Sequence, residues 1–209
     1  MSGMSGMGGS GAGAPGVHNV LMVGVGGQGI ILASDILAEA AMLAGLDAKK
    51  SEVHGMSQRG GPVFSHVRFG EAVHSPVIGK GEADVLYSLE RMELLRWAGW
   101  ARPGASAVYA DTDMPPAGTA AYPAGLDAEI AARFGRVVRF DSRATRAEIN
   151  PKAKNVALLG AVSMLLPLPL DAYRAAIADL VPAGTQDANL AAFDAGRRIA
   201  AEQLDLPLP

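Results

Sequence analysis

The chain has 209 residues, of which 49% are hydrophobic and 19% are charged, and its net charge at pH 7 is −3. These values are ordinary for one soluble domain with a sizeable core, and they exclude the broad positive surface that holds a nucleic-acid backbone. The sequence contains no cysteine, which excludes disulfides, thiolate-bound zinc and cysteine-ligated iron–sulfur clusters and fits a cytoplasmic protein.

Residues 1–16, MSGMSGMGGSGAGAPG, are dominated by glycine and serine and carry no charged side chain. This composition predicts a flexible tail and is typical of neither a signal peptide nor a transit peptide. We expect one domain over residues 17–205, without an internal linker, and a short tail over residues 206–209. The most apolar segment, residues 155–170, falls short of the about 20 residues needed to cross a bilayer, so no membrane association is expected.

The first elements in the chain read as the opening of a βαβ unit. Residues 17–25, VHNVLMVGV, form a compact apolar run that predicts a buried strand. After the turn GGQG, residues 30–45 place apolar side chains at helical spacing and end at Gly45, a natural helix stop. Residues 46–53, LDAKKSEV, then predict a second strand.

Residues 62–70, PVFSHVRFG, alternate in the way that a strand does. The alternation predicts two faces, one with Val63, Ser65, Val67 and Phe69 and the other with Phe64, His66 and Arg68. A turn at Gly70–Glu71 predicts that this strand forms a hairpin with residues 72–78.

The rest of the chain alternates strands with a helix and then becomes helical. The patterns predict strands over 83–90, 104–111 and 135–142, a helix over 91–100, and mainly helix from about 153 to 203. Residues 155–170 predict a buried helix, part of whose surface could meet a partner subunit. The expected fold class is α/β: a single doubly wound Rossmann-like domain with a β-hairpin insertion and a helical C-terminal third.

The turn between the first strand and the first helix carries glycines in G-x-G-x-x-G spacing. Gly24 would allow the tight turn, Gly26 would let a phosphate approach the backbone, and Gly29 would let the helix lie close to the strand. The helix N-terminus then offers unpaired N–H groups to an anion. The alternative is a bare glycine turn without a ligand.

A dinucleotide site of this kind also needs an acidic side chain near the end of the second strand, to hold a ribose hydroxyl. That region reads DAKKSE here, and Lys49 and Lys50 favour a phosphate over a hydroxyl. A phosphorylated adenosine ligand such as NADP or coenzyme A therefore fits better than NAD. The alternative for the two lysines is a solvated strand end.

A second loop follows the second strand, with the sequence HGMSQRGG. Ser57, Gln58 and Arg59 can all donate hydrogen bonds to an anion or a carbonyl. If this loop leaves the carboxyl end of its strand, it lies beside the glycine loop, at the edge of the sheet where ligands bind in open α/β folds.

Two histidines lie in the same stretch, His54 and His66. They could act as acid–base groups, or they could orient loops and pack at an interface. No carboxylate partner for a catalytic triad and no metal-ligand spacing accompanies them. We therefore assign no catalytic residue and no metal site.

The residues just described carry a resemblance to a known family. Residues 23–70, VGVGGQGI through SHVRFG, together with SPVI at 75–78 and ADVLYSLE at 83–90, resemble the gamma-type domain of 2-oxoacid:ferredoxin oxidoreductases. Within that family they are most similar to the separate small (beta) subunits of indolepyruvate ferredoxin oxidoreductases. The resemblance is dense from Asn19 to Glu90, with NVALLGA at 155–161 as a further stretch, and GVGGQG combined with SEVHGMSQRGG is its specific part.

The resemblance implies a reaction and a division of labour. A 2-oxoacid, here an indolepyruvate or another arylpyruvate, is decarboxylated on thiamine diphosphate, electrons pass through 4Fe–4S clusters to ferredoxin, and coenzyme A captures the acyl group. The thiamine site and the clusters belong to a larger alpha subunit, which agrees with the lack of cysteine here. The gamma-type domain has no chemistry of its own in this family and is implicated in holding coenzyme A.

The expected role is therefore an accessory subunit that completes the oxidoreductase and helps to bind coenzyme A. Its expected ligand-binding residues are Gly24, Gly26, Gly27, Gln28 and Gly29 in the first loop and Ser57, Gln58 and Arg59 in the second. One alternative is a purely structural subunit of the same complex. Another is a stand-alone NADP-binding reductase, although none of the four tyrosines begins a Y-x-x-x-K pair.

Overall fold

The computed structural model describes residues 16–54, 61–114 and 122–208. The strands are β1 (His18–Val25), β2 (Asp47–His54), β3 (Pro62–Gly70), β4 (Ala83–Ser88), β5 (Ala101–Ala110) and β6 (Arg136–Phe140). The helices are α1 (Ile30–Leu43), α2 (Arg91–Trp97), α3 (Leu126–Arg133), α4 (Lys154–Ser163), α5 (Leu170–Leu180) and α6 (Gln186–Leu204). Short 3₁₀ turns cover Ala98–Trp100, Ala144–Ala147 and Pro151–Ala153.

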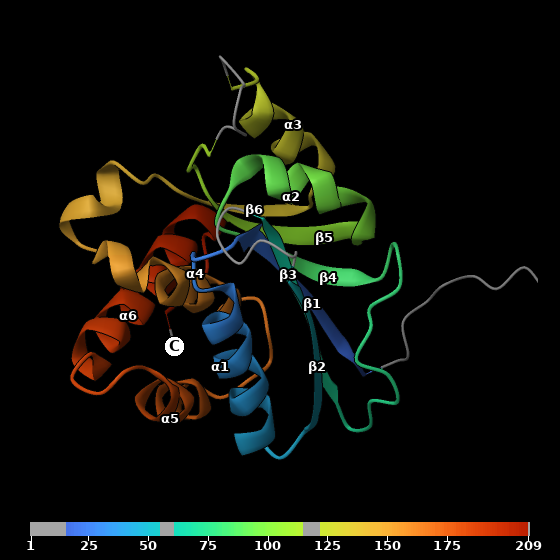
Figure 1. The fold of residues 1–209 in the computed structure, drawn as a ribbon, viewed down its shortest axis with the longest axis vertical. Coiled ribbons are helices and arrows are strands. Elements are labelled where there is room, and N and C mark those ends of the chain that lie inside the picture. The colour runs from blue at the N-terminus through green and yellow to red at the C-terminus, as the bar shows by residue number, and fades with distance from the viewer. Residues whose placement is uncertain (1–15, 55–60, 115–121, 209) are drawn as a thin grey trace, which may run out of the picture.

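The strands form one six-stranded sheet in the order β2-β3-β1-β4-β5-β6. Strands β1, β4, β5 and β6 run parallel, whereas β3 lies antiparallel to both β1 and β2. Helices α1, α4, α5 and α6 gather on one side of the sheet, and α2 and α3 cover the other (Figure 1). The predicted doubly wound α/β fold with a helical C-terminal third is confirmed.

The hairpin, however, joins different segments from those predicted. Residues 72–78 form no strand, and β3 pairs instead with β2, from His54 opposite Val63 to Asp47 opposite Gly70. The β2–β3 hairpin inserts β3 between β1 and β2, so the first two strands of the chain are not neighbours in the sheet.

Side chains of β3 explain why the segment after it stays irregular. The Arg68 guanidinium donates to the carbonyls of Ser75 (3.0 Å) and Val77 (3.1 Å). The Ile78 N–H donates to Nδ1 of His66 at 3.2 Å. These backbone groups are satisfied by side chains and are therefore not available for a strand ladder.

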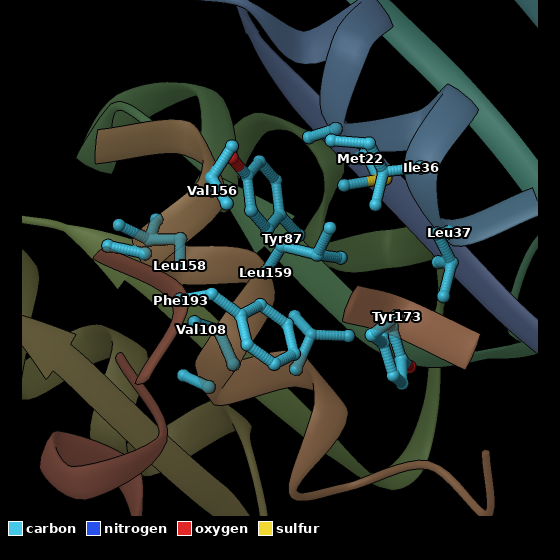
Figure 2. Close-up of a cluster of buried hydrophobic side chains, with 14 of the residues drawn as sticks. Met22, Ile36, Leu37, Tyr87, Val108, Val156, Leu158, Leu159, Tyr173 and Phe193 are labelled. Atoms are coloured by element: carbon cyan, nitrogen blue, oxygen red, sulfur yellow. The ribbon is translucent and has the colours of Figure 1, made fainter. Parts of the chain in front are cut away.

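The predicted alternation of β3 is confirmed, because its two faces enter two different cores. Val63, Val67 and Phe69 pack into the larger core under α1, α4, α5 and α6. Phe64 packs against the smaller core on the α2 and α3 side. Figure 2 shows the larger core, in which aromatic side chains of β4, α5 and α6 lie among aliphatic side chains of α1, β5 and α4.

Helix α4 crosses the middle of the larger core. All its residues after Lys154 are buried, and Val156, Leu158 and Leu159 have no exposed surface. The Tyr87 hydroxyl donates to the Asn155 carbonyl at 2.9 Å and fixes the start of the helix to β4. The predicted buried helix is confirmed up to Ser163, where its apolar surface is covered by this chain, but residues 164–169 are not helical, because the run that contains Pro167 and Pro169 ends the helix.

Helices α4 and α6 approach each other backbone to backbone at two glycines. A Cβ atom added to Gly196 would lie 1.7 Å from the Ala157 carbonyl oxygen, and one added to Gly160 would lie 2.1 Å from the Phe193 carbonyl oxygen. No side chain fits at either position, since real Cβ atoms essentially never come within 3.0 Å of another heavy atom. Only glycine permits this spacing of the helices.

The end of α6 is tied to the last strand of the sheet. The Gln203 side-chain carbonyl accepts the Arg139 N–H at 2.9 Å, and its amide donates to the Arg139 carbonyl at 2.8 Å. Both hydrogen bonds lie on the side of β6 that faces away from β5, because β6 is the last strand in the sheet order. The amide of one side chain thus repeats the pairing that a neighbouring strand would make.

Candidate functional site

The glycine loop lies at the point where the sheet reverses its winding. Helix α1 leaves β1 toward one face of the sheet and α2 leaves the adjacent β4 toward the other. The carboxyl ends of β1 and β4 therefore diverge, and this is the position at which open α/β sheets bind ligands. The loop of residues 26–29 follows β1 at this position, as the sequence predicted.

Gln28 closes this junction with its own side chain. Its Oε1 accepts the Val25 N–H at 2.7 Å, while its Nε2 donates to the Leu89 carbonyl at 3.2 Å. The same nitrogen lies 3.2 Å from the Met114 sulfur. Gln28 therefore links the end of β1 to the end of β4 and shapes the loop, with its amide already occupied by the chain.

Two glycines at this junction face side chains of the same chain. A Cβ on Gly24, in β1, would lie 2.7 Å from Gln28 Oε1 and 2.8 Å from Ile30 Cδ1, which are the ends of flexible side chains and can move. A Cβ on Gly29 would lie 2.5 Å from Asn155 Nδ2, which donates to the Gly29 carbonyl at 3.0 Å. Gly29 also has a φ of +82°, the left-handed region that favours glycine. Gly29 therefore needs glycine whether or not a ligand binds.

Some backbone N–H groups of the loop that the sequence offered to a ligand already have an acceptor within the chain. The Gly26 N–H donates to the Gly61 carbonyl at 2.9 Å and the Gln28 N–H to the Val25 carbonyl at 3.2 Å. The N–H groups of Gly27, Gly29 and Ile30 donate to no residue in the described part of the chain. Gly27 has a φ of +93°, and a Cβ there would meet nothing within 4 Å. Among the described residues, these backbone donors at the positive end of α1 thus remain for an anion.

The second loop cannot be placed in the same way. Ser57, Gln58 and Arg59 lie outside the described residues, as does the side chain of His54. Gly61, which follows them, accepts the Gly26 N–H. The assignment of Ser57, Gln58 and Arg59 to the ligand site stays a prediction.

The two lysines of β2 do not take part in this site. Lys49 donates to Asp47 at 3.0 Å, and Lys50 pairs with Asp35 of α1 and lies 3.5 Å from Glu52. Strand β3 lies between β2 and β1, and its residue Val67 is paired with both Lys50 and Val20. Lys50 is therefore level with Val20, which lies five residues before the end of β1. This places Lys50 about 16 Å along the strand direction from the glycine loop. The interpretation of these lysines as part of the phosphate site is wrong, and their charges pair instead with carboxylates on the surface of β2 and α1.

His66 is a structural residue. It is 3% exposed, accepts the Ile78 N–H, and lies edge-on to Phe64 and Trp100, with ring centroids 5.6 Å and 5.4 Å away. Burial, with a smaller contribution from the Arg68 charge, lowers the pKa of His66 below its usual value. The imidazole is therefore held neutral as a hydrogen-bond acceptor, which excludes it as an acid at the glycine loop.

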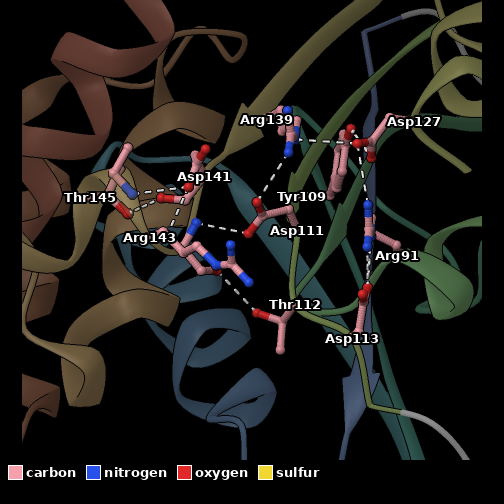
Figure 3. A network of polar contacts seen from close by, with 12 residues as sticks. Arg91, Tyr109, Asp111, Thr112, Asp113, Asp127, Arg139, Asp141, Arg143 and Thr145 are labelled. Carbon is pink, nitrogen blue, oxygen red and sulfur yellow. Dashed lines mark hydrogen bonds and ion pairs between the residues drawn. The ribbon is translucent and has the colours of Figure 1, made fainter. Parts of the chain in front are cut away.

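A polar network that the sequence analysis missed continues along the same edge of the sheet (Figure 3). Arg91, after β4, pairs with Asp113 and reaches Asp127 at 3.2 Å. The Tyr109 hydroxyl donates to Asp127 at 2.9 Å, and Arg139 donates to Asp111 at 3.1 Å. Burial first, and then the bond to Asp127, raises the pKa of Tyr109. These charges compensate one another and hold the ends of β4, β5 and β6 together.

Lys154 is a cation on this edge. Among the described residues, its side chain donates hydrogen bonds to hydroxyl groups only. Its Nζ donates to Thr112 Oγ1 (2.9 Å) and Ser142 Oγ (2.7 Å). Burial lowers its pKa, and the Asp111 charge opposes that shift. Lys154 also lines a cavity of about 210 Å³ together with Arg146. The positive charge beside this cavity thus comes from Lys154 at the start of α4 and from Arg146 of the 3₁₀ turn Ala144–Ala147, and not from β2.

One signal in the sequence could have located this region. Asp111 and Thr112 follow β5, and Asp141 and Ser142 follow β6. Polar side chains directly after consecutive parallel strands meet at one edge of a sheet. Applied to these segments, that rule would have brought them together with the glycine loop.

Neither a metal centre nor a membrane span emerges from the described ranges. No group of three or more histidine, aspartate and glutamate side chains comes together there in a way that could hold a metal ion. None of the helices in the part of the chain that the structure covers has the length and apolar character to cross a membrane.

Comparison with known proteins agrees with this architecture. The family described as pyruvate ferredoxin/flavodoxin oxidoreductase matches residues 19–199. The chain is 37% identical over 199 residues to the indolepyruvate oxidoreductase subunit IorB of Thermococcus kodakarensis, covering 90% of this chain and 98% of the relative.

Two solved structures share the fold. One is the gamma subunit of a keto/oxoacid ferredoxin oxidoreductase from Geobacter sulfurreducens, with a TM-score of 0.67 and 24% identity over 88% of this chain and 99% of that one. The other is the 2-oxoglutarate:ferredoxin oxidoreductase of Magnetococcus marinus, bound to 2-oxoglutarate, coenzyme A and succinyl-CoA. It has a TM-score of 0.68 and 22% identity over 90% of this chain and 32% of that one.

Proposed function

The chain belongs to the pyruvate ferredoxin/flavodoxin oxidoreductase family, and on that premise we propose that it is the small subunit of an indolepyruvate-type 2-oxoacid:ferredoxin oxidoreductase. The observation that carries this proposal is the length of the match to the indolepyruvate subunit, which extends over 98% of that relative. The similarity therefore covers a whole subunit and not one shared module. The protein acts as part of an oxidoreductase and is not expected to be active alone.

In this proposal the redox chemistry takes place on a larger alpha subunit. The substrate is an indolepyruvate or another arylpyruvate, and thiamine diphosphate and 4Fe–4S clusters carry out its oxidative decarboxylation on the partner. This chain cannot supply thiolate ligands to such clusters because it has no cysteine. Electrons leave the complex on ferredoxin. A cytoplasmic location is part of the same proposal.

We further propose that the chain contributes to binding coenzyme A at the carboxyl edge of its sheet. The diphosphate would lie against the free N–H groups of Gly27, Gly29 and Ile30, where a helix N-terminus favours negative charge. Lys154 and Arg146 would supply positive charge farther along the same edge. A related structure that holds coenzyme A and shares this fold supports the choice of ligand.

The other predicted residues keep narrower parts in this proposal. Gln28 and Gly24 shape the loop, and Gly26 joins it to Gly61. Arg59, with Ser57 and Gln58, would face the ligand or the partner subunit, so Arg59→Ala is expected to weaken the use of coenzyme A while leaving assembly intact. Unchanged coenzyme A dependence of this variant would remove Arg59 from the site.

The assembly part of the proposal is tested by reconstitution. The chain is co-expressed with a large thiamine- and cluster-binding subunit, and indolepyruvate-dependent reduction of methyl viologen is measured with and without coenzyme A. We expect activity only when both chains are present, and a preference for indolepyruvate over pyruvate and 2-oxoglutarate. Full activity of the large subunit alone, or of this chain alone with NADPH, would contradict the proposal.

The ligand part is tested separately by isothermal titration. Coenzyme A is titrated into the chain alone and into the assembled complex, with NADP as the competing ligand. Binding of coenzyme A in at least one of the two, and no binding of NADP, is the expected result. Heat in neither titration would assign a purely structural role to the chain, with the glycine loop as a packing turn.

A further inference from the structure

A cavity of about 460 Å³ lies at the end of α4 opposite the glycine loop. Helix α4 starts beside the loop, where Asn155 contacts Gly29, and its ten residues cover about 15 Å before Ser163, which lines the cavity. The volume is in the range of small-molecule sites, roughly 300 to 1,000 Å³. The lining consists largely of the aliphatic or thioether side chains of Met164, Leu166, Leu168, Leu170 and Leu206.

The charged residue in this lining is Arg197 of α6, which stands beside the hydroxyl of Ser163. Its residue surface is only 6% exposed. One guanidinium nitrogen, Nη1, donates to Ser163 Oγ at 2.9 Å, and the other, Nη2, is buried and has no hydrogen-bond partner among the described residues. A buried donor without an acceptor is costly, and a buried charge without a counter-charge is more so.

The neighbouring carboxylate does not neutralise this arginine. Asp194 instead accepts two hydrogen bonds from Arg174, at 2.8 Å and 3.0 Å. Two guanidinium groups therefore share one carboxylate, and Arg197 forms no ion pair among the described residues. Burial lowers the pKa of Arg197, and only the charge of Asp194 and, more weakly, Tyr173 oppose that shift. Arg174, Arg197 and Asp194 together carry one net positive charge.

We propose that this cavity binds an alkyl monocarboxylate, with its carboxylate beside the Arg197 guanidinium and its hydrocarbon chain along the leucines. A single guanidinium in an apolar lining suits a single carboxylate, since a phosphate would need several donors. The lining offers no aromatic ring that would favour an aryl acid over an alkyl chain. Binding would supply the negative charge that Arg197 lacks among the described residues.

The site is independent of the coenzyme A proposal, because it lies at the far end of α4. The first experiment compares octanoate with octanamide on the full chain by isothermal titration and by thermal shift. The two probes have the same hydrocarbon chain and differ in the charge of the head group. We expect octanoate to bind at least tenfold more tightly than octanamide and to raise the melting temperature.

The second experiment uses Arg197→Met, which keeps the length of the side chain and removes its charge. Octanoate affinity should fall at least tenfold and become equal to that of octanamide. The melting temperature without ligand should stay unchanged or rise, because an uncompensated buried charge has been removed. Arg198→Met is the matched control, since the next arginine along is exposed and pairs with Glu148. It should leave octanoate binding intact.

Three outcomes would overturn the assignment. The first is equal binding of octanoate and octanamide to the unaltered chain, including binding of neither. The second is unchanged octanoate affinity in Arg197→Met. If that variant unfolds, Arg197→Lys takes its place, and the assignment fails when this variant keeps the octanoate affinity of the unaltered chain and binds octanamide equally well. The third is loss of octanoate binding on assembly with the large subunit, which would assign the cavity to a carboxylate of the partner.

Discussion

Two regions of this molecule depend on glycine, for different reasons. At the α4–α6 crossing, Gly160 and Gly196 face backbone carbonyl groups of the opposite helix, and no side chain can enter. At the β1–α1 junction, Gly24 and Gly29 face the ends of side chains, and Gly27 faces open space. Glycine is thus required at both positions of the helix crossing, whereas at the β1–α1 junction it is required at Gly29 and leaves room at Gly27.

The difference shows that a glycine pattern does not by itself distinguish a binding loop from a packed one. The G-x-G-x-x-G spacing suggested three glycines with ligand-related roles, yet Gly29 is needed for the backbone conformation and for the contact with Asn155, without any ligand. What separates the two roles is what a Cβ atom would contact. Substitution by alanine adds that atom, so it tests the comparison directly.

The largest effect is expected at the α4–α6 crossing. In Gly196→Ala the new Cβ would collide with the Ala157 carbonyl, and the helices would have to move apart through the core. We expect the free energy of unfolding to fall by about 3 kcal/mol, measured by urea denaturation. Gly99→Ala is the control, since a Cβ at Gly99 meets nothing within 4 Å and should have little effect. A stable Gly196→Ala protein would contradict the backbone contact.

An intermediate effect is expected for Gly29→Ala. The new Cβ would displace the Asn155 amide and would also occupy a left-handed conformation. Together we expect a loss of about 2 kcal/mol in the free energy of unfolding. A double-mutant cycle with Asn155→Ala checks the cause, because removing the asparagine should relieve the clash. Strict additivity of the two changes would show that Asn155 is not the limiting contact.

Gly27→Ala should cost about 1 kcal/mol in stability, from the left-handed conformation alone. Gly81 is a matched control, with a φ of +79° and no atom within 4 Å of an added Cβ. Gly81→Ala should therefore lose the same stability. Titration of coenzyme A into the assembled complex should then separate the two, with weaker binding only for Gly27→Ala. Equal coenzyme A affinity in both variants would place the ligand away from Gly27.

The smallest expected effect is on the pH dependence of stability and concerns His66, whose Nδ1 already accepts the Ile78 N–H. Its pKa is lowered in the folded state, so below about pH 6.5 the unfolded chain binds a proton that the folded chain resists. The contribution of His66 to stability is full above that pH and is lost as the pH falls toward the lowered pKa. Urea denaturation between pH 8 and pH 5 should show a smaller loss for His66→Gln than for the unaltered chain. Parallel pH profiles would contradict the neutral, acceptor role.

Local patterns predicted most of the fold. The apolar run of β1, the spacing of α1 and its stop at Gly45, and the alternation of β3 all depend on near neighbours in the chain. The partner of β3 could not be predicted, because it depends on Arg68 and His66 taking up the backbone of the following segment. Helix α3 was also missed. It is short, its packing against the sheet is tertiary, and no strong periodicity marks it.

The candidate site was predictable in place but not in composition. The position of the glycine loop follows from strand, turn and helix order. The part played by Lys154 does not, because its partners Thr112 and Ser142 follow β5 and β6 and lie 42 and 12 residues before it in the chain. The lysines at 49 and 50 misled for the same reason, since the inserted β3 moves β2 away from the loop. Sequence reasoning works where neighbours along the chain decide, and it fails where distant segments do.

The link between Gln203 and Arg139 has a consequence for how the molecule meets other molecules. An unprotected outer strand invites β-augmentation and amyloid-like stacking, because its peptide groups are ready to accept a foreign strand. Here one glutamine amide occupies both peptide groups of Arg139, the fourth of the five residues of β6. At this residue the C-terminal helix therefore leaves a foreign strand neither the N–H nor the carbonyl that it would need for pairing.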